Sequence, residues 1–264
     1  MSFLGPVGSL IPVKCASQLT SSGGREVSFA RTLGKQKAFL GRVTAREWDV
    51  DIGLATPSEL SGLRWLASYA RGPLVWYGPD AVIGNVLDEP VAGLVPGFHN
   101  GVEGPMVEVQ PETWVKAALP STSALSLPFR SGVVDPVPVV AGQPVTISAW
   151  LRGNTLSGRQ NLTVFWRNID NTVISSQGVD FGVSPGFERR VATLIPPLSA
   201  AGFTIQFFAQ QVAGPSVTLT DQLMPYSPGR GAKRVVAHGL QDAVIRAIEN
   251  QQYQSLIFSL TEVG

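Results

Sequence analysis

The sequence has few of the residues on which metal proteins and many enzymes depend. It contains one cysteine, Cys15, and two histidines, His99 and His238, among 264 residues. A single cysteine excludes a disulfide within the chain, and these three residues are too few for an ordinary zinc site. We expect Cys15 to be a small buried apolar residue. The composition therefore predicts a protein without metal or cofactor, made in a reducing compartment.

Charge and long apolar runs are also scarce. Charged residues make up 15% of the chain and the formal net charge is +1. This leaves no basic field to attract nucleic acid or an anionic membrane, so we expect no nucleic-acid partner. No run of 18 apolar residues occurs, which predicts no membrane insertion. The N-terminus lacks the basic start and apolar core of a signal peptide, and we expect a soluble chain.

The sequence is rich in turn residues and short apolar runs. Hydrophobic residues reach 44%, with 28 glycines and 20 prolines. From about residue 100 to 225, apolar and polar residues alternate, as in Val145–Arg152 and Leu162–Arg167. The further candidate strands are 113–118, 124–129, 172–176, 188–195, 204–209 and 216–223. About eight or nine strands with turns between them indicate a two-sheet β-sandwich or jelly roll. The segments 153–161 and 168–171 are expected as hairpin connections.

The first 90 or so residues have an α+β pattern. We predict strands at 10–13, 27–32, 43–52 and 74–77, with a turn at Gly78-Pro79-Asp80. A helix is predicted from Thr56 to Arg71, because Thr56-Pro57-Ser58-Glu59 forms a capping box and Gly72-Pro73 ends the helical spacing.

The C-terminal part begins with an expected linker, Ser227–Gly231. The segment Arg230–Arg234, with three positive charges and no phosphate-loop signature, is interpreted as a solvated linker. Strands are predicted at 233–240 and 256–263, with a short helix or turn at 241–250. So short a strand pair must dock on other structure. We expect it to return to the N-terminal part, which gives a discontinuous assembly domain of residues 1–95 plus 230–264 and an inserted domain of residues 96–229. The alternative is that it closes the second domain.

Three aromatic residues fall in the polar phase of their strands: Trp150, Phe165 and Phe208. Exposed on a sheet face, these rings could stack on sugar rings. The alternative is a sheet covered on both faces, by a loop or by a neighbouring subunit. Trp76 and Tyr77, beside a Gly-Pro turn, are interpreted as packing residues.

Asp221 is the one acidic residue with an unusual position. It falls in phase with Val217, Leu219 and Leu223, and an unpaired inward carboxylate is costly. It could be satisfied by hydrogen bonds, turned outward by a bulge, or bind calcium, as related jelly rolls often do near their last strand. No partner carboxylates accompany it. The two histidines are interpreted as structural or surface residues, and no Gly-x-Ser-x-Gly nucleophile motif occurs. The sequence predicts no enzyme.

Several segments together resemble the minor tail and distal tail proteins of long-tailed (siphovirus-type) phages of actinobacteria. They are Arg46–Val50, Thr56–Glu59 with its helix, Gly72–Tyr77, Ala81–Leu87 and Ser255–Gly264. The middle of the chain, at Val145–Arg152, Leu162–Arg167 and Val217–Leu223, resembles jelly-roll carbohydrate-binding modules.

The resemblance implies a mainly β virion protein of the tail tip or baseplate. A small α+β domain with one helix would form a ring, as a hexamer, joining the tail tube to the tip. A galectin-like or carbohydrate-module-like jelly roll would project outward. The implied partners are copies of itself, the tube, tape-measure and hub proteins, and weakly bound host carbohydrate. The protein would be assembled in the host cytoplasm. The alternative is a stand-alone carbohydrate-binding module or lectin.

Overall fold

The protein is mainly β and divides into two compact units. A computed structural model describes residues 2–13, 18–22, 25–31, 37–43, 45–69, 72–110, 113–120, 124–130, 133–153, 159–248 and 251–263. The sandwich unit comprises Met1–Leu10 and Tyr77–Ala232, and the small unit comprises Ile11–Trp76 and Lys233–Gly264. Cys15 lies outside the described residues.

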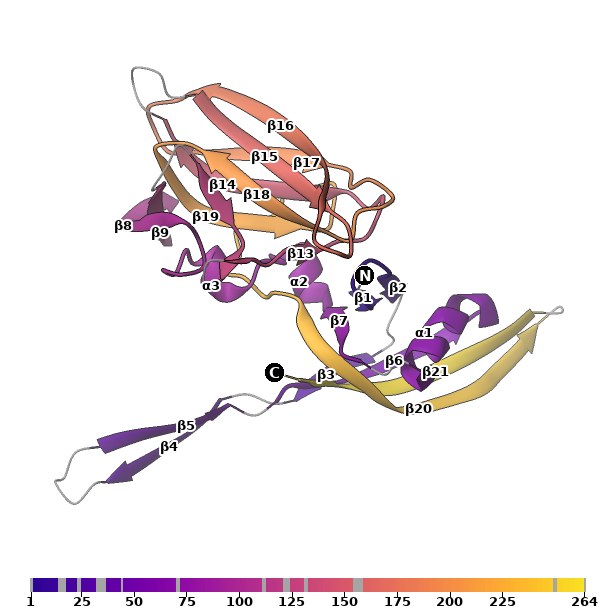
Figure 1. Ribbon diagram of the computed structural model, residues 1–264. Coiled ribbons are helices and arrows are strands. Elements are labelled where there is room, and N and C mark those ends of the chain that lie inside the picture. The colour runs from indigo at the N-terminus through magenta and orange to yellow at the C-terminus, as the bar shows by residue number, and fades with distance from the viewer. Residues whose placement is uncertain are drawn as a thin grey trace. The chain divides into compact units, whose positions relative to one another are not determined.

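The sandwich unit is built from two antiparallel sheets (Figure 1). The first sheet has the order β17-β14-β19-β9-β8, and the second has the order β10-β18-β15-β16, with β13 also paired to β18. The strands of the first sheet are β8 (Gly101–Gln110), β9 (Thr113–Pro120), β14 (Val145–Arg152), β17 (Glu188–Leu194) and β19 (Gln211–Thr218). Those of the second are β10 (Leu125–Leu127), β13 (Val137–Pro138), β15 (Arg159–Arg167), β16 (Val173–Val183) and β18 (Gly202–Phe208). The remaining elements of the unit are β1 (Ser2–Gly5), α2 (Pro79–Ile83), α3 (Glu89–Ala92), β11 (Phe129–Arg130) and β12 (Val133–Val134).

The core lies between the two sheets and follows from the two-residue period of the strands. Alternate residues of β15, such as Val164, are buried, and Trp166 packs against Phe203 with ring centroids 5.7 Å apart. In β14 every residue from Val145 to Leu151 is buried, so both faces of this strand are covered. The predicted β-sandwich is confirmed, with one half-buried strand in β15 and one fully buried strand in β14.

Three local predictions in this unit are wrong. The 153–161 segment does not connect a hairpin, because β14 pairs with β17 and β19 whereas β15 pairs with β16 and β18. Strands β14 and β15 lie in different sheets, and residues 154–158 between them are outside the described residues. Strand β19 ends at Thr218 instead of Leu223, and β8 was not predicted. The Gly78–Asp80 turn opens helix α2, with Pro79 as its first residue.

One buried side chain, that of Asn85, links three parts of the sandwich unit. Its Nδ2 donates to the carbonyls of Pro215 (3.1 Å) and Ser227 (3.2 Å). Its Oδ1 accepts from the backbone N–H groups of Val217 (3.0 Å) and Leu87 (3.1 Å). Both donors and both acceptor positions of the amide are thus satisfied at a site with 0% exposure.

This linkage explains where the chain divides. The predicted boundary lay at residue 95, but residues 77–95 group with the sandwich unit. Beyond the Asn85 bonds, Val86 N–H donates to Val217 O (2.8 Å) and Leu219 N–H donates to Val82 O (3.0 Å). These two bonds join Val217 and Leu219 to residues 82–86, and so attach residues 77–95 to strand β19.

The small unit is a sheet with one helix. Its strands β7, β20, β21, β6 and β3 are neighbours in that order. Their bounds are β3 (Gln18–Ser22), β6 (Glu47–Ala55), β7 (Leu74–Tyr77), β20 (Lys233–Ile248) and β21 (Gln251–Glu262), and β2 (Ile11–Val13), β4 (Arg25–Arg31), β5 (Lys37–Val43) and α1 (Pro57–Tyr69) complete the unit. Leu60, Leu63 and Leu66 of α1 are buried, and Leu60 N–H donates to Thr56 O. The predicted helix is confirmed.

The C-terminal segment is a long β-hairpin. It contains no helix at 241–248, because β20 pairs with β21 from Val235 opposite Glu262 to Ile248 opposite Gln251, with register shifts after His238 and after Val244. Gly239, at φ +68°, accompanies a register shift in this pairing. Strand β21 pairs with β6 and β20 pairs with β7, so of the two alternatives the segment returns to the N-terminal strands.

The Asn85 bonds predict how two substitutions affect stability. Replacing Asn85 with Ala leaves two backbone carbonyls and two N–H groups without partners in a buried site, each costing about 1–3 kcal/mol. Asn85→Asp keeps the acceptors but turns a carboxylate oxygen toward two carbonyls. We expect each variant to lower the free energy of unfolding by about 3 kcal/mol or more in chemical denaturation. Gln222→Ala, which removes an exposed amide, should change it by less than about 0.5 kcal/mol.

Candidate functional site

The three predicted aromatic residues do not form one surface. Trp150 lies on β14 in the first sheet, whereas Phe165 on β15 and Phe208 on β18 lie in the second. Because the two sheets face each other across the core, their outer faces point in opposite directions. Sequence periodicity identified the outward phase correctly but could not assign the strands to sheets.

Trp150 is buried, with 3% of its surface exposed. The edge of Tyr226 meets its ring at 5.5 Å and 73°, and the Arg189 guanidinium lies 5.0 Å from its centroid. Gly214 leaves room for the ring, since a Cβ there would lie 2.9 Å from it. The expectation of an exposed stacking surface is wrong for Trp150, and the alternative of a covered face holds.

The cover on Trp150 is an extended segment that follows β19, residues 223–231, here called the strap. Arg189 Nη2 donates to Met224 O at 2.7 Å, and Asn85 binds Ser227 O. Farther along, the N–H groups of Arg230 and Gly231 donate to the carbonyls of Asn85 and Leu87, each at 2.9 Å. The linker at Ser227–Gly231 is therefore tied to the sandwich unit. The solvated linker predicted at Arg230–Arg234 is wrong, because these bonds hold its first two residues and β20 begins at Lys233.

Burial where the strap meets the first sheet shifts the pKa values of two ionisable groups. Desolvation lowers the pKa of Arg189 and raises the pKa of Tyr226. In both groups burial favours the neutral form, which is the expected direction for packing residues. Val115, Ala117 and Ala213 complete this apolar cluster.

The outer face of the second sheet carries the other two aromatic residues. Phe165 pairs with Thr204 and Phe208 pairs with Asn161 across β15 and β18. The two rings are therefore four residues apart along the strands, about 13 Å. Both are half-buried. Of the predicted site residues, these two are the ones that the structure brings to one face.

Polar side chains occupy the space between the two rings. Thr163 lies opposite Gln206, and Ser126 of β10 lies opposite Gln206 on its other side. Gln206 Nε2 donates to Ser126 Oγ at 3.2 Å. Hydroxyl and amide groups flanked by aromatic rings can bind a sugar chain, because the rings stack on its apolar faces and the polar groups bind its hydroxyls.

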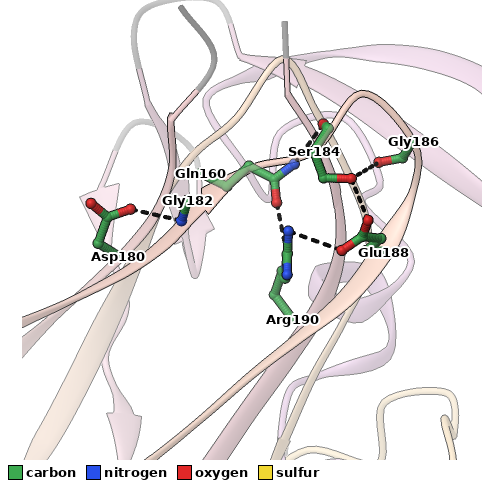
Figure 2. Close-up of polar contacts among 7 residues, drawn as sticks. All are labelled: Gln160, Asp180, Gly182, Ser184, Gly186, Glu188 and Arg190. Atoms are coloured by element: carbon green, nitrogen blue, oxygen red, sulfur yellow. Dashed lines mark hydrogen bonds and ion pairs between the residues drawn. The ribbon is translucent and has the colours of Figure 1, made fainter. Parts of the chain in front are cut away.

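A polar network at the β16–β17 connection was missed by the sequence reasoning (Figure 2). Gln160, which is fully buried, donates from Nε2 to Ser184 O (3.0 Å) and accepts from Arg190 Nε (2.9 Å). Glu188 accepts from Ser184 Oγ (2.5 Å) and pairs with Arg190 Nη2 (2.9 Å). Ser184 is only 3% exposed, and the network holds the crossover from β16 to β17 between the two sheets.

Asp221 is exposed, and β19 has already ended at Thr218. The strand phase that would turn its carboxylate inward does not extend to it. Within the described ranges, no group of three or more His, Cys, Asp and Glu side chains gathers in a metal-binding arrangement.

The two histidines have local structural partners. His99 Nδ1 accepts from Gly101 N–H at 3.0 Å, so the other ring nitrogen, Nε2, carries the hydrogen and donates to Leu94 O at 2.8 Å. His238 lies 2.8 Å from Thr261 Oγ1 on the exposed surface of the β20–β21 hairpin. In the part of the chain that the structure describes, no helix is long and apolar enough to cross a bilayer.

Trp76 and Tyr77 are packing residues, as predicted, with exposures of 1% and 0%. The Tyr77 hydroxyl donates to Pro138 O at 2.9 Å. Burial raises the pKa of Tyr77 well above 10, and the nearby Asp88 charge raises it further.

Comparisons with known proteins give only distant likenesses. No protein-family profile matches the sequence, and a comparison with well-characterised protein sequences finds no match. Among solved structures, the tailspike protein 4 of bacteriophage CBA120 is 9% identical with a TM-score of 0.29, over 76% of this chain and 19% of that protein. A carbohydrate-binding module of the β-sandwich superfamily is 8% identical with a TM-score of 0.30, over 100% of this chain and 92% of that module. The Dit protein of phage SPP1 is 13% identical with a TM-score of 0.20, over 98% of each chain. All three TM-scores are below 0.5, and we therefore base the functional proposal on this chain's own residues.

The raised pKa of Tyr77 predicts an alkaline loss of stability. Because its folded-state pKa lies above the unfolded value, the stabilisation is complete below about pH 10 and is lost as the pH rises further, by about 1.4 kcal/mol per pH unit. Tyr77→Phe should flatten this loss in chemical denaturation between about pH 9 and 11, at a cost of about 1 kcal/mol at neutral pH. Tyr226→Phe, at a partly exposed site, should flatten it less. Equal alkaline slopes in Tyr77→Phe and the unmodified chain would contradict the assignment.

Proposed function

We propose that this chain is a structural protein of a phage tail, a distal tail or minor tail component of the tail tip or baseplate. Its small unit would assemble into a ring, a hexamer, that joins the tail tube to the tip. Copies of itself and the tube, tape-measure and hub proteins would be its partners. The sandwich would serve contacts rather than catalysis, and the protein would act in the virion after assembly in the host cytoplasm.

The arrangement of the segments that resemble tail proteins supports this proposal. Arg46–Val50 is mostly β6, Thr56–Glu59 opens α1, and Ser255–Gly264 is largely β21. Although more than 200 residues separate them, β6 and β21 are direct neighbours, with Trp48 opposite Leu260. These three segments therefore fall in the small unit, whereas Ala81–Leu87, which also resembles tail proteins, belongs to the sandwich unit.

The observation that carries the proposal is the β4–β5 arm, Arg25–Arg31 paired with Lys37–Val43. Its two strands pair with each other and with no third strand among the described residues. A two-stranded hairpin alone is at best marginally stable in water, so it needs another surface to rest on. In a ring, that surface would be the neighbouring copy.

Removing the arm changes one hydrogen bond of the sheet, that from Glu262 N–H to Arg46 O (2.8 Å). Ser22 of β3 and Glu47 of β6 are already paired, so an Asn-Gly turn can replace residues 23–46 and close the same hairpin. We expect this arm-less chain to unfold at the same temperature within a few degrees. It should fail to form the rings that the full chain forms in negative-stain microscopy, and it should be absent from purified particles.

A second variant tests whether assembly needs the contacts of the arm or only the length of chain between β3 and β6. An arm replaced by a flexible Gly/Ser loop of equal length should also fail to assemble. A full chain that is absent from particles by mass spectrometry would contradict the tail assignment, even if it forms rings. Rings formed equally by the arm-less chain would contradict the role of the arm.

A second function, weak binding of host glycan, is favoured by the outer face with Phe165 and Phe208. Each site would be weak, and repetition around a ring would raise the avidity. The same face would serve the alternative, a stand-alone carbohydrate-binding protein. The assembly experiments distinguish the two, because a free lectin would bind glycan without entering particles.

If this face binds glycan, removing either phenylalanine ring should weaken glycan binding, and removing an apolar side chain elsewhere should not. Phe165→Ala and Phe208→Ala should each weaken binding to immobilised cell-wall polysaccharides about three- to tenfold, because each removes a stacking ring worth about 0.5–1.5 kcal/mol. Ile169→Ala, which shortens an apolar residue exposed by 71% elsewhere on the unit, should leave binding unchanged. Binding that survives both phenylalanine substitutions in folded protein would argue against this face.

A further inference from the structure

Most edge strands of the sandwich carry features that prevent pairing with another chain. Strand β8 contains Pro105, two glutamates and two register shifts, and β17 begins with Glu188, Arg189 and Arg190. Strands β10 and β13 are three and two residues long. Proline, charge, bulges and short length are the usual protections of exposed edges.

Strand β16 lacks most of these protections. It is 11 residues long, pairs with β15 and with no other described strand, and contains no proline and one charged residue, Asp180. Register shifts occur near both of its ends, but Ser175–Asp180 pairs regularly with Asn161–Trp166. Its apolar residues Val173 and Val183 are 43% and 59% exposed.

An edge of this kind presents a row of unpaired backbone N–H and C=O groups to solvent. Addition of an antiparallel strand would satisfy them, and main-chain hydrogen bonds would supply the affinity. We infer that β16 pairs edge to edge with β16 of a second copy of this chain, which joins two sandwiches into a continuous sheet. This contact lies beyond the proposed function, because it uses the sandwich unit and closes at two copies.

The sequence of β16 is compatible with pairing to itself. In a two-fold arrangement centred on Gly178, each Gly178 lies opposite its counterpart and Val173 lies opposite Val183. Asp180 then lies opposite Ser176, whose hydroxyl can donate to the carboxylate. The two Asp180 carboxylates are four residues apart along the strands, about 13 Å, which exceeds the screening length of about 8–10 Å. No like charges oppose each other.

Gly178 supplies a sharp test. A Cβ added there meets nothing within 4 Å, so the isolated unit tolerates a side chain at this position. In the proposed pair, any charge at position 178 lies directly opposite the same charge. Gly178→Lys and Gly178→Glu should therefore each weaken self-association about fivefold or more, whereas an equimolar mixture of the two should associate.

The experiment uses sedimentation of the full chain from about 1 µM to about 1 mM, with affinity capture of mixed variants. We expect the unmodified chain to pair, and tagged Gly178→Lys to retain untagged Gly178→Glu but not untagged Gly178→Lys. Leu198→Lys and Leu198→Glu, charges placed at a residue exposed by 88%, should leave pairing unchanged. The mixing should give the same result in the arm-less chain, where the proposed ring contact is absent.

Three results would overturn the inference. The first is an arm-less chain with unchanged β16 that stays monomeric to about 1 mM. The second is a Gly178→Lys or Gly178→Glu variant that pairs as well as the chain with Gly178. The third is a mixture of these two variants that does not recover pairing. If the arm-less chain forms no rings but still pairs through β16, the inference about β16 holds. Ring formation tests only the proposed function.

Discussion

The sandwich unit depends on the four hydrogen bonds of the Asn85 amide. A primary amide has two donors and an acceptor oxygen that takes two bonds, and here all four bonds go to backbone groups in three parts of the chain. The site is buried, so water cannot replace a missing partner. The amide therefore fixes at once the segment after α2, the middle of β19 and the start of the strap.

From this constraint follows the difference between the two outer faces of the sandwich. The strap, anchored through Ser227 and Arg230, covers the first sheet and places Tyr226 against Trp150. On the second sheet, Phe165 and Phe208 are half-buried and lie beside hydroxyl and amide groups. The path of one extended segment thus decides which sheet can meet a ligand.

The same reasoning applies to strand edges. In both units, structure that is incomplete in a single copy points to assembly: the β4–β5 arm has two strands and no third, and β16 has a long edge with one charge. The two sites differ in symmetry. An arm resting on a different surface of its neighbour can repeat around a ring, whereas an edge paired with its own copy closes at two. A protein that carries both could build a ring and join it to a second.

The sequence by itself determined most strands of the sandwich, helix α1 and the absence of familiar metal or nucleophile motifs. Alternation of apolar residues in β15, and the start of α1 at Pro57 directly after Thr56, are local properties that the fold keeps. It also identified the outward phase of Trp150, Phe165 and Phe208. Only the tertiary structure decided which of these rings is covered, that β14 and β15 lie in different sheets, and that Ser227–Gly231 is tied down. Each of these outcomes depends on contacts between residues far apart in sequence, such as Tyr226 on Trp150 and Ser227 on Asn85, and periodicity along one strand carries no information about them.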